Sequence, residues 1–325
     1  MTERTLKSIT ALVPPEAVRT VGLVGAGSVG CGWAVIYLAR GYTVLVYDPA
    51  QDAAEKMKRF IENSWSTVQE LNGGEPSPPP LQRLEFTCLE RVAAGSELLH
   101  ENGPERLDVK REIFSDLTQW TRPNVVICSS SGGLPPSDLQ HGINSAWRIV
   151  IAHPFNPPYL IPLVEVLGGR DTAEEVVSWT VEFLSRLGKR PIRLRREMTA
   201  YLANRLQFAL LREAVHCLNE GVASAQSIDD ALTYGLGPRW AVMGSLMTLA
   251  LAGGEGGMRQ TIASFGVAMD KWWADLGSPC LTPEIERKLV QAAEALTSSR
   301  PISEWIRIRD ARLVKILRAM SRDEN

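Results

Sequence analysis

Cysteine and long apolar runs are scarce in this chain of 325 residues, and each shortage argues against a class of protein. The five cysteines stand apart with no C-x-x-C pair, which argues against a disulfide framework or a structural zinc site and favours a reducing cytoplasm. No segment approaches the roughly 18 consecutive apolar residues of a membrane span, and residues 1–19 lack the apolar core of a secretory signal. A formal net charge of −2 gives no reason to expect nucleic acid or an anionic membrane as a partner.

The overall composition, 45% apolar and 22% charged residues, is ordinary for a globular enzyme, and the length suits two domains or one large one. Residues 1–19 are expected to form an N-terminal extension. From residue 20 to 195, strands alternate with helices, which predicts an α/β domain built on a doubly wound parallel sheet. Helical periodicity dominates residues 196–325, which predicts an all-helical second domain.

A glycine-rich segment gives the most specific signal. An apolar strand starting at Val21 runs into Gly-x-Gly-x-x-Gly and then into a helical segment, an order that presents backbone N–H groups and a helix N-terminus to a pyrophosphate. A second strand ends at Asp48, whose carboxylate would bind the ribose of NAD and repel the 2′-phosphate of NADP. The alternative is a glycine turn in another α/β sheet, with Asp48 capping a helix. The residues expected to bind NAD here are Gly25, Gly27, Ser28, Val29, Gly30 and Asp48.

A histidine and a glutamate give the candidate catalytic pair. His153 directly follows the predicted strand 149–152, and ligands of open α/β sheets bind beyond the carboxyl ends of the strands. Its ordinary pKa of about 6.5 suits a proton acceptor near neutral pH. Glu165 lies inside an apolar run, where a buried carboxylate is costly unless paired, and His153 is the obvious partner. The alternative is that His153 merely caps the end of a strand.

Several sequence segments resemble those of the 3-hydroxyacyl-CoA dehydrogenase superfamily, whose pattern is His-x-x-Asn-Pro followed by a buried Glu twelve residues on. Within it the chain is most similar to the branch that acts on free acids, represented by carnitine 3-dehydrogenase and the lambda-crystallin/L-gulonate 3-dehydrogenase group. The resemblance covers roughly residues 21–273. It rests on residues 104–111, 134–140, 152–159, 161–166, 238–241 and 252–259.

This resemblance implies a Rossmann-type domain followed by a helical domain that forms a homodimer, and an NAD-dependent oxidation of the 3-hydroxyl of a small acid. His153 would be the general base, Glu165 would orient it, and Asn204 would lie near the substrate oxygen. From the residues alone, Asn204 could equally be a solvated helix residue, and Glu105 with Lys110 a surface ion pair of little energetic value. Family positions that contact the cofactor or the bound pair match Glu105, Lys110 and Asn156.

One position departs from the family pattern. The family carries Ser-Thr-Ser after the preceding strand, and its last Ser bonds the reacting oxygen, whereas Gly132 stands there in this chain. Losing such a donor can cost about 100- to 1000-fold in rate. Either Ser131 reaches the site from a shifted loop, or the chemistry differs. The alternative functions are therefore an NAD-binding protein with a structural or sensing role, and a specialised biosynthetic reductase or non-redox enzyme.

The substrate is expected to be a free acid rather than a thioester. Residues 69–80, where an acyl-CoA enzyme needs basic groups for the CoA phosphates, contain no Lys or Arg. Arg239 and Arg259 are candidate anchors for the substrate carboxylate, because guanidinium binds carboxylate in a bidentate fashion. Either could instead be a structural residue that caps a helix. No metal ion is expected.

Overall fold

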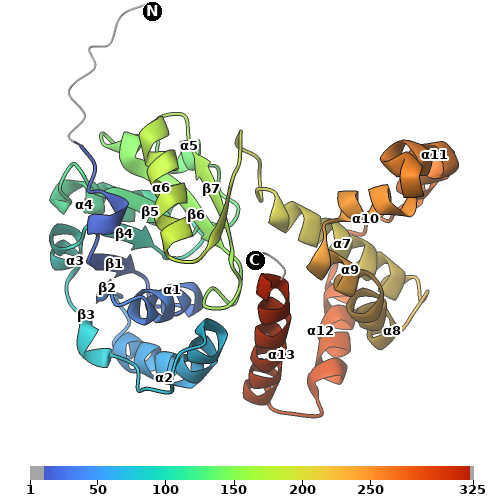
Figure 1. The fold of residues 1–325 in the computed structure, drawn as a ribbon, viewed down its shortest axis with the longest axis horizontal. Coiled ribbons are helices and arrows are strands. Elements are labelled where there is room, and N and C mark those ends of the chain that lie inside the picture. Colours follow the sequence, from blue (N-terminus) through green and yellow to red (C-terminus); the bar gives the residue numbers. More distant parts are fainter. Residues whose placement is uncertain (1–10, 323–325) are drawn as a thin grey trace, which may run out of the picture. The chain divides into compact units, whose positions relative to one another are not determined.

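The computed structural model describes residues 11–322, and the chain divides into two compact units, Met1–Asn204 and Arg205–Asn325 (Figure 1). Part of the expected N-terminal extension, residues 1–10, lies outside the described residues. Residues 11–19 pack on the first unit, where the Val13 N–H donates to the Asn124 carbonyl and the Trp179 indole donates to the Val13 carbonyl.

The first unit is built on an eight-stranded sheet with the order β3-β2-β1-β4-β5-β6-β7-β8. Neighbouring strands are parallel except for β6 and β7, so β7 and β8 run against the other six. The predicted doubly wound sheet is confirmed as mostly parallel, and β3 is a strand that the sequence did not predict. The strands are β1 (Thr20–Val24), β2 (Thr43–Tyr47), β3 (Leu84–Phe86), β4 (Leu98–Glu101), β5 (Val126–Ser129), β6 (Ile149–Pro154), β7 (Leu163–Gly168) and β8 (Arg190–Arg193).

Helices cover both faces of this sheet, which is why its central strands are apolar on both sides. On one face, side chains of α3, α4 and α5 form a core with alternate residues of the strands, among them Leu99, Ile127 and Ile149. On the other face, Tyr37 of α1 and Phe183 of α6 lie with ring centroids 6.4 Å apart. The helices are α1 (Ser28–Ala39), α2 (Ala53–Asn72), α3 (Leu89–Gly95), α4 (Leu107–Trp120), α5 (Pro136–Leu139) and α6 (Glu174–Arg186).

The described residues of the second unit form helices joined by short loops, with no strand among them, as predicted. The sequence places the domain boundary after residue 195, whereas the units divide after Asn204. Residues just before that point stay with the first unit because Tyr201 is 1% exposed and donates its hydroxyl to the Leu134 carbonyl. The helices are α7 (Ala203–Asn219), α8 (Ala225–Asp230), a π-helix (Ala231–Leu236), α9 (Gly237–Val242), α10 (Ser245–Ala252), α11 (Gly257–Asp275), α12 (Pro283–Thr297) and α13 (Ile302–Arg322). Across residues 11–322, no helix combines the length and apolar character needed to cross a bilayer.

Candidate functional site

The glycine-rich turn connects β1 to α1 at the carboxyl edge of the sheet. Gly25 has φ +101°, a left-handed conformation that favours glycine. A Cβ on Gly30 would lie 2.0 Å from the Gly25 carbonyl oxygen, so the close approach of α1 to the turn also requires glycine. The turn therefore has the backbone geometry that the sequence fingerprint predicts.

This turn fits the phosphates of NAD. A Cβ on Gly27 would meet no heavy atom within 4 Å, so the backbone there is open to a ligand. No side chain caps α1, which leaves its first N–H groups for an anion, and Ser28 at its first turn is exposed. Asp48, just past β2, accepts the Ala26 N–H at 2.7 Å and so lies beside the turn. Its binding of the ribose of NAD stays a prediction.

His153 and Glu165 face each other across the antiparallel pair of β6 and β7, where they are register partners. The imidazole Nδ1 lies 2.9 Å from Glu165 Oε2. The other oxygen of Glu165, Oε1, accepts the N–H groups of Leu202 at 2.9 Å and Ala203 at 2.8 Å. Glu165 is fully buried and His153 is 8% exposed. The structure thus brings the two predicted residues into direct contact.

The hydrogen bonds of Glu165 determine its charge and the tautomer of His153. Burial by itself raises the pKa of the Glu165 carboxyl, but the bonds from His153, Ala203 and Leu202 outweigh burial and lower the pKa overall. An ionised carboxylate only accepts hydrogen bonds, so the imidazole proton is on Nδ1. Nε2 is then the ring nitrogen that can take part in proton transfer with a substrate. The rings of Phe155 and Tyr201 pack against the imidazole, with centroids 4.8 Å and 5.6 Å away.

Gly132 and Asn204 lie next to the Nε2 edge of His153. The Asn204 side-chain amide donates to the Gly132 carbonyl at 2.9 Å. A Cβ on Gly132 would lie 2.9 Å from His153 Nε2 and 3.4 Å from Asn204 Nδ2. Three of the positions singled out from the sequence therefore meet at one point at the carboxyl edge of β5 and β6.

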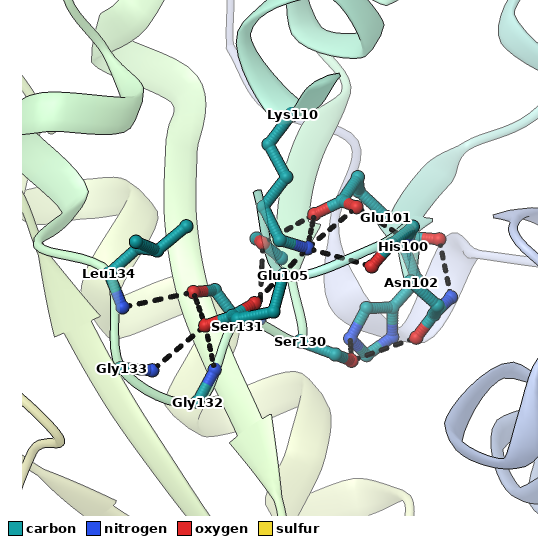
Figure 2. Close-up of polar contacts among 12 residues, drawn as sticks. His100, Glu101, Asn102, Glu105, Lys110, Ser130, Ser131, Gly132, Gly133 and Leu134 are labelled. Carbon is teal, nitrogen blue, oxygen red and sulfur yellow. Dashed lines mark hydrogen bonds and ion pairs between the residues drawn. The ribbon is translucent and has the colours of Figure 1, made fainter. Parts of the chain in front are cut away.

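Ser131, the other serine expected to act on the substrate, points elsewhere. Its hydroxyl donates to Glu105 Oε1 at 2.7 Å and accepts the Leu134 N–H at 3.3 Å. The same Glu105 oxygen accepts the N–H groups of Gly132 and Gly133, each at 3.0 Å (Figure 2). A direct role of Ser131 in the reaction stays a prediction, and in this conformation its hydroxyl serves Glu105.

Lys110 is buried rather than part of a surface ion pair. Its ammonium lies 2.9 Å from both oxygens of Glu101 and 3.1 Å from the Gly103 carbonyl, and it is 1% exposed (Figure 2). Glu105 Oε2 is 3.6 Å from the same nitrogen. The charge of Lys110 is thus largely balanced inside the protein, and its expected contact with the cofactor stays a prediction.

Sequence reasoning missed a buried polar group under this site. His100 lies between two hydroxyls: that of Tyr37 is 3.0 Å from Nδ1, and that of Ser130 is 3.0 Å from Nε2. Burial lowers the pKa of His100 to about 3, so the ring is neutral. Ser130 also accepts the Trp33 indole N–H at 3.0 Å and donates to Asn102 at 2.8 Å. A polar pair at the end of the apolar strand β4, His100 and Glu101, was the available signal.

Three further predicted residues are exposed, one in the first unit and two in the second. Asn156 is exposed just beyond β6, three positions after His153. Arg239 in α9 and Arg259 in α11 are exposed residues of the second unit, and their role as carboxylate anchors stays a prediction. Among residues 11–322, no cluster of His, Cys, Asp and Glu side chains is arranged to hold a metal ion.

Comparison with known proteins agrees with the fold. Residues 20–198 match the family model of the NAD binding domain of 3-hydroxyacyl-CoA dehydrogenase, and residues 201–295 match that of its C-terminal domain. The chain is 43% identical to an L-carnitine dehydrogenase of Streptomyces coelicolor over 96% of this chain and 98% of the relative. It is 42% identical to an L-carnitine dehydrogenase of Streptomyces griseus, over 95% and 92% of the two chains. A crystal structure of FHMPC 5-dehydrogenase, described as an NAD+ dependent dismutase, superimposes with a TM-score of 0.81 at 25% identity, covering 94% of this chain and 99% of that one.

Proposed function

This chain belongs to the 3-hydroxyacyl-CoA dehydrogenase family and is an NAD-dependent oxidoreductase that acts on CH–OH groups, and we propose that it oxidises the 3-hydroxyl of a small carnitine- or gulonate-like 3-hydroxy acid. His153 and Glu165 carry this proposal. An unprotonated Nε2, held in its tautomer by a buried carboxylate 2.9 Å from Nδ1, is the arrangement that a general base requires.

The reaction is derived from the residues of the first unit. NAD, when bound at the glycine-rich turn, supplies the acceptor for the hydride of the carbinol carbon. His153 Nε2 takes the hydroxyl proton, and the charge of Glu165 stabilises the imidazolium that forms. The Asn204 amide has two N–H groups, of which one donates to Gly132. The other would donate to the substrate oxygen as negative charge develops on it.

The free acid is favoured over a thioester on two grounds. The relatives at about 40% identity over the whole chain are L-carnitine dehydrogenases, and residues 69–80 offer no cation for the phosphates of CoA. The substrate carboxylate would then be anchored by Arg239 or Arg259. We further propose that the protein acts in the cytoplasm as a homodimer.

The proposal is tested by following NADH absorbance with L-carnitine, D-carnitine, L-gulonate, 3-hydroxybutyrate and 3-hydroxybutyryl-CoA. A free acid should be the best substrate, and His153→Ala should lower kcat by about 10²–10⁴-fold, the usual contribution of a general base, with the Kd for NAD unchanged. His141→Ala is the matched control, because His141 is an exposed histidine of the same unit. Tight NAD binding without turnover of any of these acids, or near-normal kcat in His153→Ala, would contradict the proposal.

A second function is favoured by the serine hydroxyls around Gly132. The hydroxyl of Ser130 donates to Asn102 and that of Ser131 donates to Glu105, so neither donates toward Nε2 of His153. With that donor missing, the protein would bind NAD in a structural or sensing role, or act in biosynthesis as a reductase or non-redox enzyme. Product analysis with NAD, with NADH and with neither coenzyme separates these possibilities from the oxidation.

A further inference from the structure

Three consecutive serines, beginning with the last residue of β5, each donate a hydrogen bond to a side chain at the end of β4 or in the loop that follows it. Ser129 donates to Glu101 Oε2 at 2.6 Å, Ser130 donates to Asn102 at 2.8 Å, and Ser131 donates to Glu105 at 2.7 Å. The loop after β5 is therefore tied, residue by residue, to the loop after β4 (Figure 2). These bonds fix the position and direction of the backbone between the end of β5 and Gly132.

Glu105 makes the last and most extensive of these ties. A single oxygen, Oε1, accepts the Ser131 hydroxyl and the N–H groups of Gly132 and Gly133. Two successive N–H groups can converge on one acceptor only in a narrow range of backbone conformations. Glu105 therefore specifies the shape of the turn as well as its position.

The turn that Glu105 holds approaches His153 so closely that a side chain has no room. A Cβ on Gly132 would lie 2.9 Å from Nε2, closer than a carbon and a nitrogen normally come. The imidazole is not free to withdraw, because Nδ1 is bonded to Glu165 and the rings of Phe155 and Tyr201 pack against it. One side of the contact is fixed by Glu165 and the other by Glu105.

We propose that Glu105 is a positioning residue for the reaction: its Oε1 holds the Gly132–Gly133 turn against His153, and so fixes the imidazole edge that receives the substrate proton. This inference rests on the proposed function of His153. It differs from a contact with NAD, because the three donors are groups of the protein itself. Positioning by Glu105 depends on an acceptor oxygen at the place of Oε1 and not on the negative charge of the carboxylate. We call the hydrogen bonds from Ser131, Gly132 and Gly133 to Glu105 Oε1 the clamp. By holding the turn against His153, the clamp also requires glycine at position 132.

Replacement of Glu105 separates a positioning role from a contact with NAD, and an effect of the acceptor oxygen from an effect of the charge. Glu105→Gln keeps an acceptor oxygen, and should leave kcat and amide hydrogen exchange at Gly132 and Gly133 within about threefold of wild type. Glu105→Ala removes it, so exchange at both amides should accelerate at least about tenfold, and kcat should fall about 10- to 100-fold through misplacement of the reacting groups. The Kd for NAD should change less than about twofold. Glu85→Gln and Glu85→Ala are matched controls, because Glu85 is 47% exposed and Glu105 is 46% exposed, each beside one cation.

A double-mutant cycle then tests the link to Gly132. Gly132→Ala should lower kcat in the wild-type background, but its additional effect should be at least about threefold smaller beside Glu105→Ala, because a released turn can move away from the imidazole. If Glu105→Ala does not fold, Glu105→Asp, which withdraws the carboxylate by one methylene, should give the same exchange and kcat changes.

Three results would overturn the inference: unchanged amide exchange in Glu105→Ala, equal loss of kcat in Glu105→Gln and Glu105→Ala, or a loss of NAD affinity that accounts for the loss of kcat. Strictly additive effects of Glu105→Ala and Gly132→Ala would count against the clamp as well. The exchange measurement needs no substrate. A protein that oxidised none of the acids, yet lost protection of both amides in Glu105→Ala, would contradict the proposed function and leave the clamp standing.

Discussion

Replacement of Glu165 by glutamine tests the proposed base more sharply than removal of His153, because it keeps the size of the side chain and changes only its acceptors. In the native protein Oε1 accepts two backbone N–H groups and Oε2 accepts the Nδ1 proton. Glutamine has one oxygen. Placing that oxygen on the N–H groups of Leu202 and Ala203 leaves its NH₂ group facing Nδ1, which must then accept. The ring proton moves to Nε2, and the lone pair that would receive the substrate proton is lost.

The opposite orientation of the amide is disfavoured. It would restore the bond to Nδ1 but leave two buried N–H groups facing an NH₂ group, at about 1–3 kcal/mol for each unsatisfied donor. We therefore expect the wrong tautomer to dominate in Glu165→Gln. A wrong tautomer of a catalytic histidine lowers kcat by about 10⁴-fold in serine proteases, and about 10³–10⁴-fold is the expected loss here. That corresponds to about 4–5.5 kcal/mol of transition-state stabilisation.

Stopped-flow measurement of NADH formation at saturating NAD gives kcat, and the ¹⁵N chemical shifts of the His153 ring report the tautomer directly. The Kd for NAD should be unchanged, since Glu165 is buried between β6, β7 and the residues at the start of α7. Glu182→Gln, at an exposed position of α6, is the control. Retention of more than about a tenth of wild-type kcat, or a ring that keeps its proton on Nδ1, would refute the reasoning.

Four further outcomes are expected. Asp48→Ser should raise kcat/KM with NADP relative to NAD by at least about tenfold, because it removes a negative charge that faces the 2′-phosphate; an unchanged ratio would contradict the role of Asp48. Gly132→Ser should lower kcat, because the added Cβ would lie 2.9 Å from His153 Nε2, and a gain in rate would indicate a decayed dehydrogenase instead. The pKa of Glu165 is lowered in the folded protein, so its stabilising contribution is present above the unfolded pKa of about 4.3 and is lost as pH falls through the folded value; urea unfolding of wild type and Glu165→Gln across this window should show the difference. Burial, with a contribution from Arg40, lowers the pKa of Lys189 to about 7, so the free energy of unfolding should rise as pH increases from about 7 to about 10, and Lys189→Met should flatten that rise.

The fold was largely predictable because its central strands are buried on both faces. Continuous apolar runs separated by helical segments specify a parallel sheet with helices on each side, and the glycine fingerprint specifies where the cofactor turn lies. Strand direction was not predictable, because the two-residue period of a strand reads the same both ways. The reversal of β7 is nevertheless what puts Glu165 opposite His153. The buried acid indicated that a partner exists, and the antiparallel pairing supplies it.

The same energetic argument could have found more of the site than it did. Glu101 is an acid at the end of an apolar strand, as Glu165 is an acid within one, and it too is fully buried with a cationic partner, Lys110. The family resemblance singled out Lys110 as a residue that contacts the cofactor or the bound pair, and it did not indicate the ion pair with Glu101. A motif preserves the type of residue, whereas the atoms that it contacts depend on the neighbouring strand.

Gly132 shows why a substitution cannot be judged from its own position. By comparison with the family pattern, glycine in place of serine removes a hydroxyl that would donate a hydrogen bond to the reacting oxygen. In the structure it is also the only residue that fits between the turn and His153, given where Glu105 holds the backbone. With Glu105 in place, restoring the serine should displace the general base and lower kcat. In Glu105→Ala the turn can move, so the serine should be accommodated and supply its hydroxyl. The sign of the change in kcat for Gly132→Ser therefore depends on Glu105, a residue that the substitution leaves untouched.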